Sequence, residues 1–420
     1  MKEKIRQLHS DSLVRNSFYL MLSTGIMAVL GFVFWFIAAR MFSPADIGIA
    51  TTLISAMNLI SYIGLLGFNS TFIRMLPTSK NRSSEMNTGL ILGTGAAIAA
   101  ATAYILLVPT IAPALSLVHD NPLYAIGFIA MTAMASVNLL TDSIFIAFRA
   151  AKYNLFIDGI VMSLVKLALP FAFVGLGAYG LFAASGAAAV SALVLSLFFL
   201  IKNFEYRPRL NLDKSTLNGV VKYSLANYVA NLLNIAPTLI LPLVIINHLG
   251  PANAGYYYLG FMVANLLYTV VYAVSQSLFA EGSYADRGLR ELMKRGSVVI
   301  AAIMIPGAAA IYFGATLLLS VYGGSYAVEA APLLQIFALA GPLVAVYTIA
   351  NVLLRITKQT WAIIIVNVVY MVSIGGFAEL WAGNGLVWIG YAWLVGHILA
   401  SATALGFLGW KLRRDSQALV

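Results

Sequence analysis

The sequence predicts an all-α membrane protein with about twelve transmembrane helices in two lobes of six. Three observations lead to this fold class. Hydrophobic residues make up 61% of the chain and charged residues only 10%, against about 25% charged residues in an average soluble protein. Apolar stretches of about twenty residues, the length of one crossing, recur along the whole chain. None shows the ten-residue alternation of an outer-membrane β-barrel. The 420 residues leave room only for short connections between crossings.

The first half of the chain contains six of these apolar stretches. They follow a basic N-terminal segment, residues 1–17, which we expect to be cytoplasmic. No small-residue cleavage site follows the first apolar stretch, so we expect that helix to remain in the mature protein. The six predicted helices form an N-lobe over residues 18–201 and cover residues 18–39, 47–72, 89–108, 123–148, 155–176 and 179–201.

The second half repeats this pattern after a basic connection. Residues 202–222 are polar and carry five lysines and arginines, so they are predicted to be a cytoplasmic linker between the lobes. Residues 411–420 form a predicted cytoplasmic tail. The C-lobe spans residues 223–410, with helices predicted at residues 225–248, 254–279, 298–321, 333–354, 361–381 and 386–410.

Matching turns in the two halves indicate an internal repeat. Ser43–Gly48 aligns with Gly250–Gly255, and at the same offset Asn58 aligns with Asn265. Ser43 is suited to cap the second helix, with proline at the first helical position, where its missing N–H costs nothing. Since each half has six crossings, the two repeats are predicted to run parallel, related by an axis along the membrane normal.

The positive charges are distributed unevenly over the predicted connections. Of the 25 lysines and arginines, all except Arg40 and Lys166 fall in the termini or in the connections on one side. The positive-inside rule therefore predicts a multi-pass protein of the cytoplasmic membrane with both termini in the cytoplasm. The net charge of +10 is explained by topology, and we expect no nucleic-acid partner.

The composition argues against an enzyme and against a cofactor. The chain has no cysteine and only four histidines, so thiolate, zinc and haem chemistry is not expected. No glycine-rich phosphate loop of the ATPase type occurs. The predicted outer connections are too short to hold a catalytic site. If the chain is a transporter, we expect its energy to come from an H⁺ or Na⁺ gradient, from the membrane potential or from substrate supply.

One charged residue falls in the middle of a predicted helix. Lys166 lies roughly 16 Å into the fifth helix, close to the membrane midplane, where a retained charge indicates a functional site. On an α-helix, Asp158 would lie about 80° around from Lys166. Asp142 and Arg149 share one face of the fourth helix. We expect these four residues to line one partly wet cavity, in which Lys166 either binds substrate or pairs with an acid.

Uncharged amides form a second pattern. Asn58 and Asn69 are predicted to share a face of the second helix, and Asn265 and Gln276 the equivalent face of the eighth. Asn231 belongs to a stripe of asparagines on the seventh helix. Such stripes either line a polar lumen for hydroxyl-rich cargo or join helices through interhelical hydrogen bonds.

Arginines near the predicted helix ends have two interpretations. Arg40, the one positive residue of the outer connections, either attracts a phosphate or pairs with Asp46. Arg74, Arg149 and Arg355 end helices on the cytoplasmic side. There they either contact lipid head groups or recruit an anionic lipid-linked substrate.

Two motifs carry a resemblance to a known family. Arg40–Gly48 and its echo Leu249–Tyr256, with Arg15-Asn16-Ser17 before the first helix, resemble the polysaccharide-transporter branch of the multidrug/oligosaccharidyl-lipid/polysaccharide (MOP) exporter superfamily, which has a MATE-like fold. The resemblance implies a flippase that moves polyprenyl-diphosphate-linked oligosaccharide across the membrane by alternating access. It would serve synthesis of lipopolysaccharide, capsule or exopolysaccharide. The implied partners are the lipid-linked glycan, membrane lipids, and a polysaccharide polymerase and glycosyltransferases.

The resemblance also assigns expected roles. Lys166 is the best-placed residue to hold the diphosphate in a cationic lumen, and Asp142 or Asp158 would carry a coupling ion. The remaining candidates for substrate binding are Arg149, Arg40, Asn58, Asn265, Asn231 and Gln276. An alternative is an ion-coupled exporter of organic cations from the same superfamily, although the first helix lacks the acid typical of multidrug members. A scaffold for glycan assembly is a third hypothesis.

Overall fold

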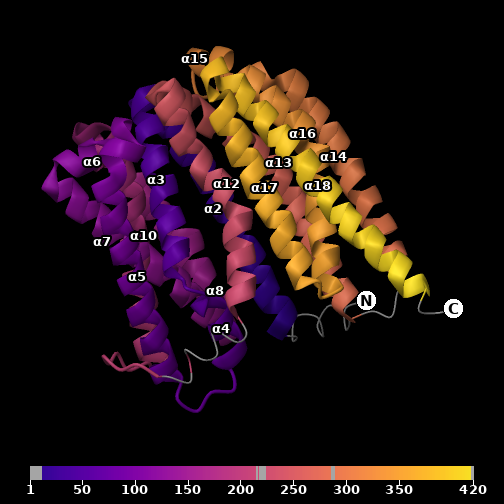
Figure 1. The fold of residues 1–420 in the computed structure, drawn as a ribbon. Helices are drawn as coiled ribbons and strands as arrows, with labels where there is room; N and C mark the ends of the chain where they lie inside the picture. Colours follow the sequence, from indigo (N-terminus) through magenta and orange to yellow (C-terminus); the bar gives the residue numbers. More distant parts are fainter. Residues whose placement is uncertain (1–11, 214–215, 217–223, 285–288, 418–420) are drawn as a thin grey trace, which may run out of the picture. The chain divides into compact units, whose positions relative to one another are not determined.

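The computed structural model describes residues 12–213, 216, 224–284 and 289–417, and within these ranges the chain is helical without any β-strand (Figure 1). Residues pack into two compact units, Met1–Tyr228 and Val229–Val420. The division falls in the first turn of the seventh predicted helix. Eleven helices of the described residues are long and apolar enough to cross a membrane. The predicted all-α membrane fold is therefore confirmed. The start of the N-terminal segment, the second half of the linker and the end of the tail lie outside the described residues.

Six crossings make up the first unit. Two short elements, η1 (Pro113–Leu115) and α6 (Leu117–Asp120), join the third crossing to the fourth. The crossings are α2 (Ser12–Met41), α3 (Pro44–Gly64) extended by α4 (Phe68–Met75), α5 (Arg82–Ile111), α7 (Pro122–Ala147), the composite of α8 (Lys152–Asn154), η2 (Leu155–Met162), α9 (Ser163–Phe173) and η3 (Val174–Leu176), and α10 (Gly177–Phe204).

The predicted start of α3 is confirmed. Ser43 Oγ accepts a hydrogen bond from the backbone N–H of Asp46 at 3.1 Å, and Oδ2 of Asp46 accepts from the N–H of Ser43 at 3.3 Å. This reciprocal capping box satisfies two backbone donors that the helix cannot pair itself. Pro44 occupies the first helical turn. In the second unit the aligned helix likewise begins at a proline, Pro251, directly after Gly250.

The prediction of one helix over residues 47–72 is wrong. α3 ends at Gly64, and the helix resumes as α4 only at Phe68. Between them Leu66 and Gly67 have φ angles of 49° and 85°. Two consecutive residues in the left-handed region cannot continue a right-handed helix. Asn69 therefore lies on α4 and not on one helical face with Asn58.

The fifth and sixth predicted helices form one long apolar run, Lys152–Phe204. When this run is counted as one span, the described residues contain eleven candidate spans, whereas twelve were predicted. The run is interrupted at η3 and at Gly177, whose φ of 56° is disfavoured for residues with a side chain. It therefore consists of two crossings, α8 to η3 and α10, which restores the predicted twelve.

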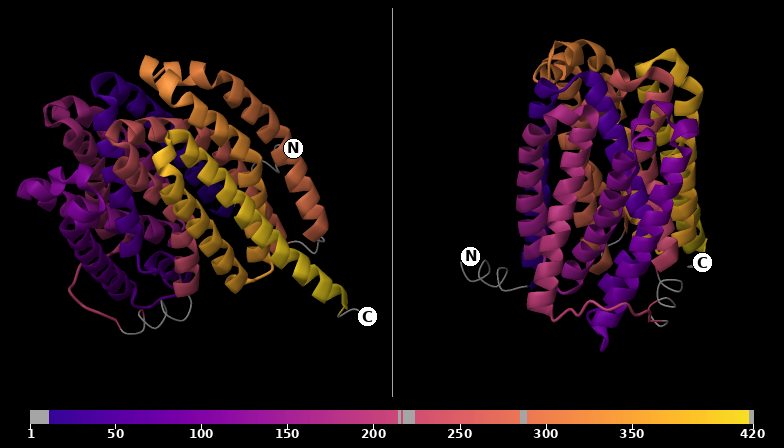
Figure 2. Two further views of the ribbon diagram at one scale, coloured as in Figure 1. Left: turned by 45° about the horizontal axis from the view of Figure 1, so that its top comes forward. Right: turned by 90° about the vertical axis from the view of Figure 1, so that its left-hand side faces the viewer.

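The second unit has six long helices and two short elements, α15 (Gly324–Glu329) and η5 (Ala382–Asn384). α16 contacts α13, α14, α17 and α18, and the two views of Figure 2 show the helices of this unit running beside one another. The long helices are α12 (Leu225–Leu249), α13 (Pro251–Tyr284), α14 (Leu289–Ser320), α16 (Ala331–Ile356), α17 (Thr360–Trp381) and α18 (Leu386–Gln417).

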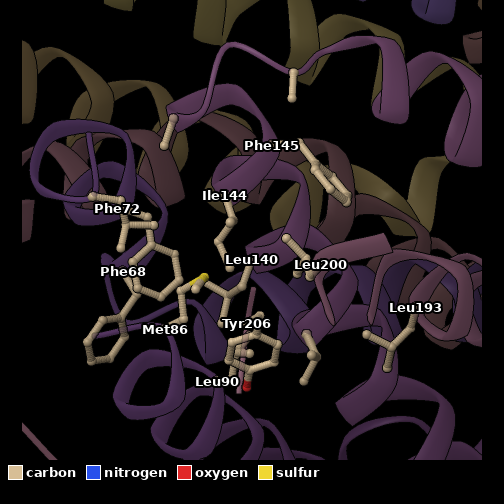
Figure 3. Packing of buried hydrophobic residues seen from close by; sticks show 14 of the residues in the cluster. Phe68, Phe72, Met86, Leu90, Leu140, Ile144, Phe145, Leu193, Leu200 and Tyr206 are labelled. Atoms are coloured by element: carbon tan, nitrogen blue, oxygen red, sulfur yellow. The ribbon is translucent and has the colours of Figure 1, made fainter. Parts of the chain in front are cut away.

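A buried cluster holds the first unit together at the end where α4 joins α5. Phe68 and Phe72 of α4 pack there with Met86 of α5 and Leu140 of α7 (Figure 3). All four are at most 1% exposed. Tyr206, just after α10, belongs to the same cluster. This packing fixes the segment after α10 against the beginning of α5.

Candidate functional site

Lys166 of α9 lies against two aromatic rings of α2. Its Nζ atom is 4.7 Å from the ring centre of Phe34 and 5.7 Å from that of Trp35. Both rings are almost completely buried and pack edge to face at 4.8 Å. An ammonium group is attracted to the electron-rich face of an aromatic ring. Among the residues that the structure describes, no ion pair involves Lys166. The rings hold the side chain in place while its charge stays uncompensated by an acid.

Asp142 of α7 and Asp158 of η2 are carried by elements that two asparagines link, since Asn154 Nδ2, four residues before Asp158, donates to the carbonyl oxygen of Asp142 at 3.3 Å. Asn138, one turn before Asp142, donates from Nδ2 to Oδ1 of Asp158 at 3.1 Å. Asn138 and Asp158 are 5% and 6% exposed. Acids at membrane depth are typical of sites that carry a proton or a small cation. The two acids are therefore suited to take up and release one of these.

Asp158 sits in a stretch of π-helix that the sequence analysis missed. η2 has the wider turn of the π form over eight residues, a form that often occurs at functional sites. The expected angle of 80° between Asp158 and Lys166 assumed an α-helix throughout and is wrong for this geometry. Gly159 lets α2 approach, because a Cβ atom there would lie 2.9 Å from Ser23 Oγ. The Ser23 hydroxyl donates to the carbonyl oxygen of Asn154 at 3.3 Å.

The second unit encloses a cavity of about 410 Å³ between α12, α13, α16 and α17. Ten of its thirteen lining residues carry an amide, hydroxyl, phenol or guanidinium group, and the lining has one arginine and no acid. The polar lining residues are Asn234, Thr238, Asn265, Tyr272, Ser275, Tyr347, Thr348, Asn351, Arg355 and Tyr370.

A chain of hydrogen bonds orients the polar groups of this cavity. Asn234 Nδ2 donates to the Tyr347 hydroxyl at 2.7 Å, and that hydroxyl donates to Oδ1 of Asn367 at 2.8 Å. Asn367 in turn donates from Nδ2 to the carbonyl oxygen of Ala230 at 2.8 Å. The ring of Tyr347 stacks on that of Tyr370, with centres 4.5 Å apart. The cavity wall is therefore fixed by paired groups.

Arg355 is the group of this lining best placed to meet an anion. Its side chain is exposed while lining the cavity, and its Nη2 donates to Oδ1 of Asn231 at 3.1 Å. Asn351, one turn earlier on α16, has a buried Oδ1 atom that accepts no hydrogen bond from the described residues, and burial keeps this atom out of a ligand's reach. The cavity thus offers a cation for an anionic group, together with the amide and hydroxyl groups of its other lining residues.

The structure brings some predicted site residues together and separates others. In the second unit Asn265 lines the cavity and Asn231 contacts its arginine. In the first unit Asn138 and Asn154 link the elements that carry the two acids, and Lys166 contacts α2. Arg149 is exposed at the turn after α7, with a φ of 55°.

The remaining predicted residues occupy separate positions. Arg40 ends α2 with its guanidinium 4.7 Å from the ring centre of Phe36. Asn58 is half-buried on α3. Gln276 lies in α13, and its side chain is outside the described residues.

Sequence reasoning missed the contribution of α16 and α17 to the cavity. Tyr347, Asn351 and Arg355 recur at i, i+4 and i+8 on α16, which places them on one helical face. This polar stripe in an apolar helix was the available signal. Asn367 and Tyr370 of α17 offered no comparable pattern.

Solved structures with the same fold are transporters. A multidrug resistance MATE family transporter of the MOP superfamily in an inward-facing conformation matches 94% of this chain and 98% of its own, with 13% identity and a TM-score of 0.73. The lipid II flippase MurJ in an inward closed conformation matches 93% and 87%, with 12% identity and a TM-score of 0.76. A MOP superfamily transporter from Pyrococcus furiosus matches 96% of each chain, with 14% identity and a TM-score of 0.63. None of the curated proteins matches the sequence.

Twelve crossings in this arrangement define a multi-pass membrane protein with the fold of MOP superfamily transporters. The family model described as "Polysaccharide biosynthesis protein" matches residues 37–330. The chain belongs to that family, which confirms the family resemblance drawn from the two turn motifs.

Proposed function

We propose that this protein is a flippase for polyprenyl-diphosphate-linked oligosaccharide, working by alternating access. The observation that carries the proposal is the cavity of the second unit, with its amides, hydroxyls and tyrosines and its single arginine. Sugars present many hydroxyl groups that both donate and accept hydrogen bonds, and their rings stack on aromatic side chains. A lining of this kind can exchange hydrogen bonds with a glycan, and membership of a polysaccharide biosynthesis family supports the same cargo.

The diphosphate of the cargo requires a cation inside the membrane. Lys166 is a candidate because its charge has aromatic neighbours and no acidic partner among the described residues. A phosphate oxygen could therefore bind the ammonium without first displacing a carboxylate. Arg355 is the second candidate, at the cavity of the second unit.

Energy coupling is assigned to the two carboxyl groups of Asp142 and Asp158. Binding of H⁺ or Na⁺ to this pair would change its charge within the first unit, and Lys166 lies two turns further along the same crossing. No cofactor is included in the proposal. The proposed location is the cytoplasmic membrane, with both termini in the cytoplasm as the charge distribution predicts. Glycosyltransferases and a polysaccharide polymerase are the proposed neighbours in synthesis.

The alternative cargo, an organic cation, is favoured by one observation only, the same carboxyl pair. The cavity lining contains no acid, whereas a cation inside a membrane protein needs an acidic or extensive carbonyl environment. We therefore rank the cation exporter second.

The experiment uses proteoliposomes that contain a short polyprenyl-diphosphate oligosaccharide with a fluorophore on the glycan. A membrane-impermeant quencher reports how fast the glycan changes leaflet. Arg355→Met should slow flipping at least tenfold, because the cavity loses its cation. Lys358→Met removes the same charge from an exposed position that does not line the cavity, and it should leave the rate unchanged.

Cells supply a second readout. Loss of the protein should remove surface glycan and leave the lipid-linked precursor facing the cytoplasm. Export of a cationic dye by the wild type, without any flipping of the glycan lipid, would instead establish the alternative cargo and overturn the flippase.

A further inference from the structure

A second cavity, of about 480 Å³, lies in the first unit where α5 begins. One wall is the turn between α4 and α5 with the first turns of α5, and the other is the segment that follows α10. Four cationic side chains line it, and Glu205 is the one acid of the lining. The cations are Lys80, Arg82, Arg207 and Arg209.

Asn87 fixes the two walls relative to each other. This residue is only 3% exposed. Its Nδ2 donates to the carbonyl oxygen of Arg207 at 3.0 Å and to Oδ1 of Asn211 at 3.1 Å. Its Oδ1 accepts from the Tyr206 hydroxyl at 2.6 Å. Burial raises the pKa of Tyr206 above its ordinary value, so the phenol keeps the proton that it donates.

Further bonds complete the attachment. Asn211 Nδ2 donates to Ser84 Oγ at 2.8 Å, and the backbone N–H of Arg207 donates to Ser83 Oγ at 3.3 Å. Arg82 donates from Nη2 to the carbonyl oxygen of Pro77 at 3.3 Å, and its guanidinium lies 5.4 Å from the ring centre of Phe148. The cationic groups are thus carried by a backbone whose position is fixed, which lowers the entropy cost of binding an anion.

The position of the cavity relative to the membrane indicates which kind of anion it would bind. α5 and α10 are both membrane-spanning, and the lining residues stand at the ends of these helices. Head groups of lipids lie at this level. Arginine presents a planar fork of donors that matches phosphate oxygens, and three of the four cations are arginines. The single acid leaves the lining with a net positive charge.

We propose that this cavity binds the phosphate-bearing head group of an anionic lipid. The head group belongs either to a phospholipid or to a polyprenyl-diphosphate carrier, and both present the same chemistry to the arginines. This site is distinct from Lys166 and from the cavity of the second unit. Its existence does not depend on whether the protein flips a glycan.

The experiment compares two charge reversals of equal size in the purified full chain in a neutral detergent. Arg207→Glu with Arg209→Glu changes two exposed lining residues. Lys152→Glu with Lys202→Glu changes two exposed residues of the same unit that do not line the cavity. The three probes are phosphatidylglycerol, farnesyl diphosphate and inorganic pyrophosphate, and the measurement is the concentration of each that gives half-maximal thermal stabilisation.

We expect the lining reversal to weaken binding of at least one lipid probe about tenfold, as loss of charge-assisted hydrogen bonds predicts. The control reversal should change it less than about twofold. A loss confined to phosphatidylglycerol identifies a phospholipid, and a loss confined to farnesyl diphosphate identifies the carrier. Equal weakening by both reversals, no weakening by either, or binding of pyrophosphate alone would overturn the proposal. If the reversals fail to fold, Arg207→Gln with Arg209→Gln against Lys152→Gln with Lys202→Gln repeats the comparison.

Discussion

The Nζ atom of Lys166 lies 4.7 Å from the centre of the Phe34 ring, so a cation on α9 rests on an aromatic face of α2. Such a contact contributes on the order of 0.5–2 kcal/mol. The contact therefore holds the lysine in place and leaves its charge intact. An ion pair with an acid would instead neutralise that charge. The distinction separates a ligand-binding role from a structural one.

Lys166→Met tests that distinction. Methionine keeps the apolar stem and removes the charge, so we expect the free energy of unfolding to change by no more than about 2 kcal/mol, the upper value for the lost cation–ring contact. Flipping of the lipid-linked glycan should fall at least tenfold, because the diphosphate loses its cation. Lys166→Arg should retain part of the rate. The matched control is Lys202→Met, whose charge is exposed at the end of α10. A normal rate in a well-folded Lys166→Met protein would remove this residue from the site.

Asp158→Asn tests the carboxyl pair. An amide keeps the size of the side chain but cannot carry a coupling proton. One of the two gradients, H⁺ or Na⁺, should accelerate flipping by the wild type, and that gradient should no longer accelerate flipping by the variant. The affinity of the variant for the lipid-linked glycan should stay within about threefold of the wild-type affinity. Flipping is measured in proteoliposomes under each gradient separately. Asp120→Asn, at an exposed acid in the described region, should behave as the wild type does. An unchanged response to the gradient in Asp158→Asn would place coupling elsewhere.

Gly64→Ala is expected to destabilise the first unit. A Cβ atom at this position would lie 2.5 Å from Ser136 Oγ and 2.9 Å from the Cβ atom of Ala97, so α3, α5 and α7 would have to move apart. Overpacking of this kind costs about 1–3 kcal/mol. The comparison is Gly95→Ala on α5, where nothing lies within 4 Å and helix propensity favours alanine by up to about 1 kcal/mol. Thermal unfolding in detergent should shift in opposite directions for the two variants.

Tyr347→Phe should weaken both the second unit and its cavity. Loss of the hydroxyl leaves Asn234 Nδ2 without its acceptor and Asn367 Oδ1 without its donor. Unpaired buried groups cost about 1–3 kcal/mol, which thermal unfolding can measure. Binding of the glycan lipid should weaken as well, since the amides lose their fixed orientation. Tyr391→Phe, at an exposed tyrosine on α18, is the control and should change neither quantity.

The sequence predicted the number of crossings and most helix bounds because apolar length is a strong signal. The capped turn at Ser43 was also predictable, since its capping residues and its proline are neighbours in the chain. The interruption at Leu66 was not predictable, because no local sequence pattern marks a leucine with a positive φ angle. Leu65 belongs to the buried cluster of the first unit and Leu66 packs against it, and these contacts form only in the folded chain.

The candidate site was only partly accessible from the sequence. Lys166 and the two acids stand out because charge is rare in an apolar helix. Their neighbours depend on tertiary contacts: Phe34 and Trp35 look like ordinary membrane residues until α9 packs on α2. Residues of four helices line the cavity of the second unit. The sequence shows their amides as separate stripes on separate helices, and only the packing of those helices brings them to one cavity.

The π-helical stretch η2 sets how the crossing tolerates a change of length. A π turn contains about one residue more than an α turn, so loss of one residue between Leu155 and Met162 converts the stretch to ordinary α-helix and leaves Lys166 on nearly the same side of the crossing. Loss of one residue of α9 before Lys166 would instead turn the lysine by about 100°, away from Phe34. Chains of this family that are one residue shorter in η2 should therefore keep the lysine, whereas chains one residue shorter at the start of α9 should carry their cation at a different position.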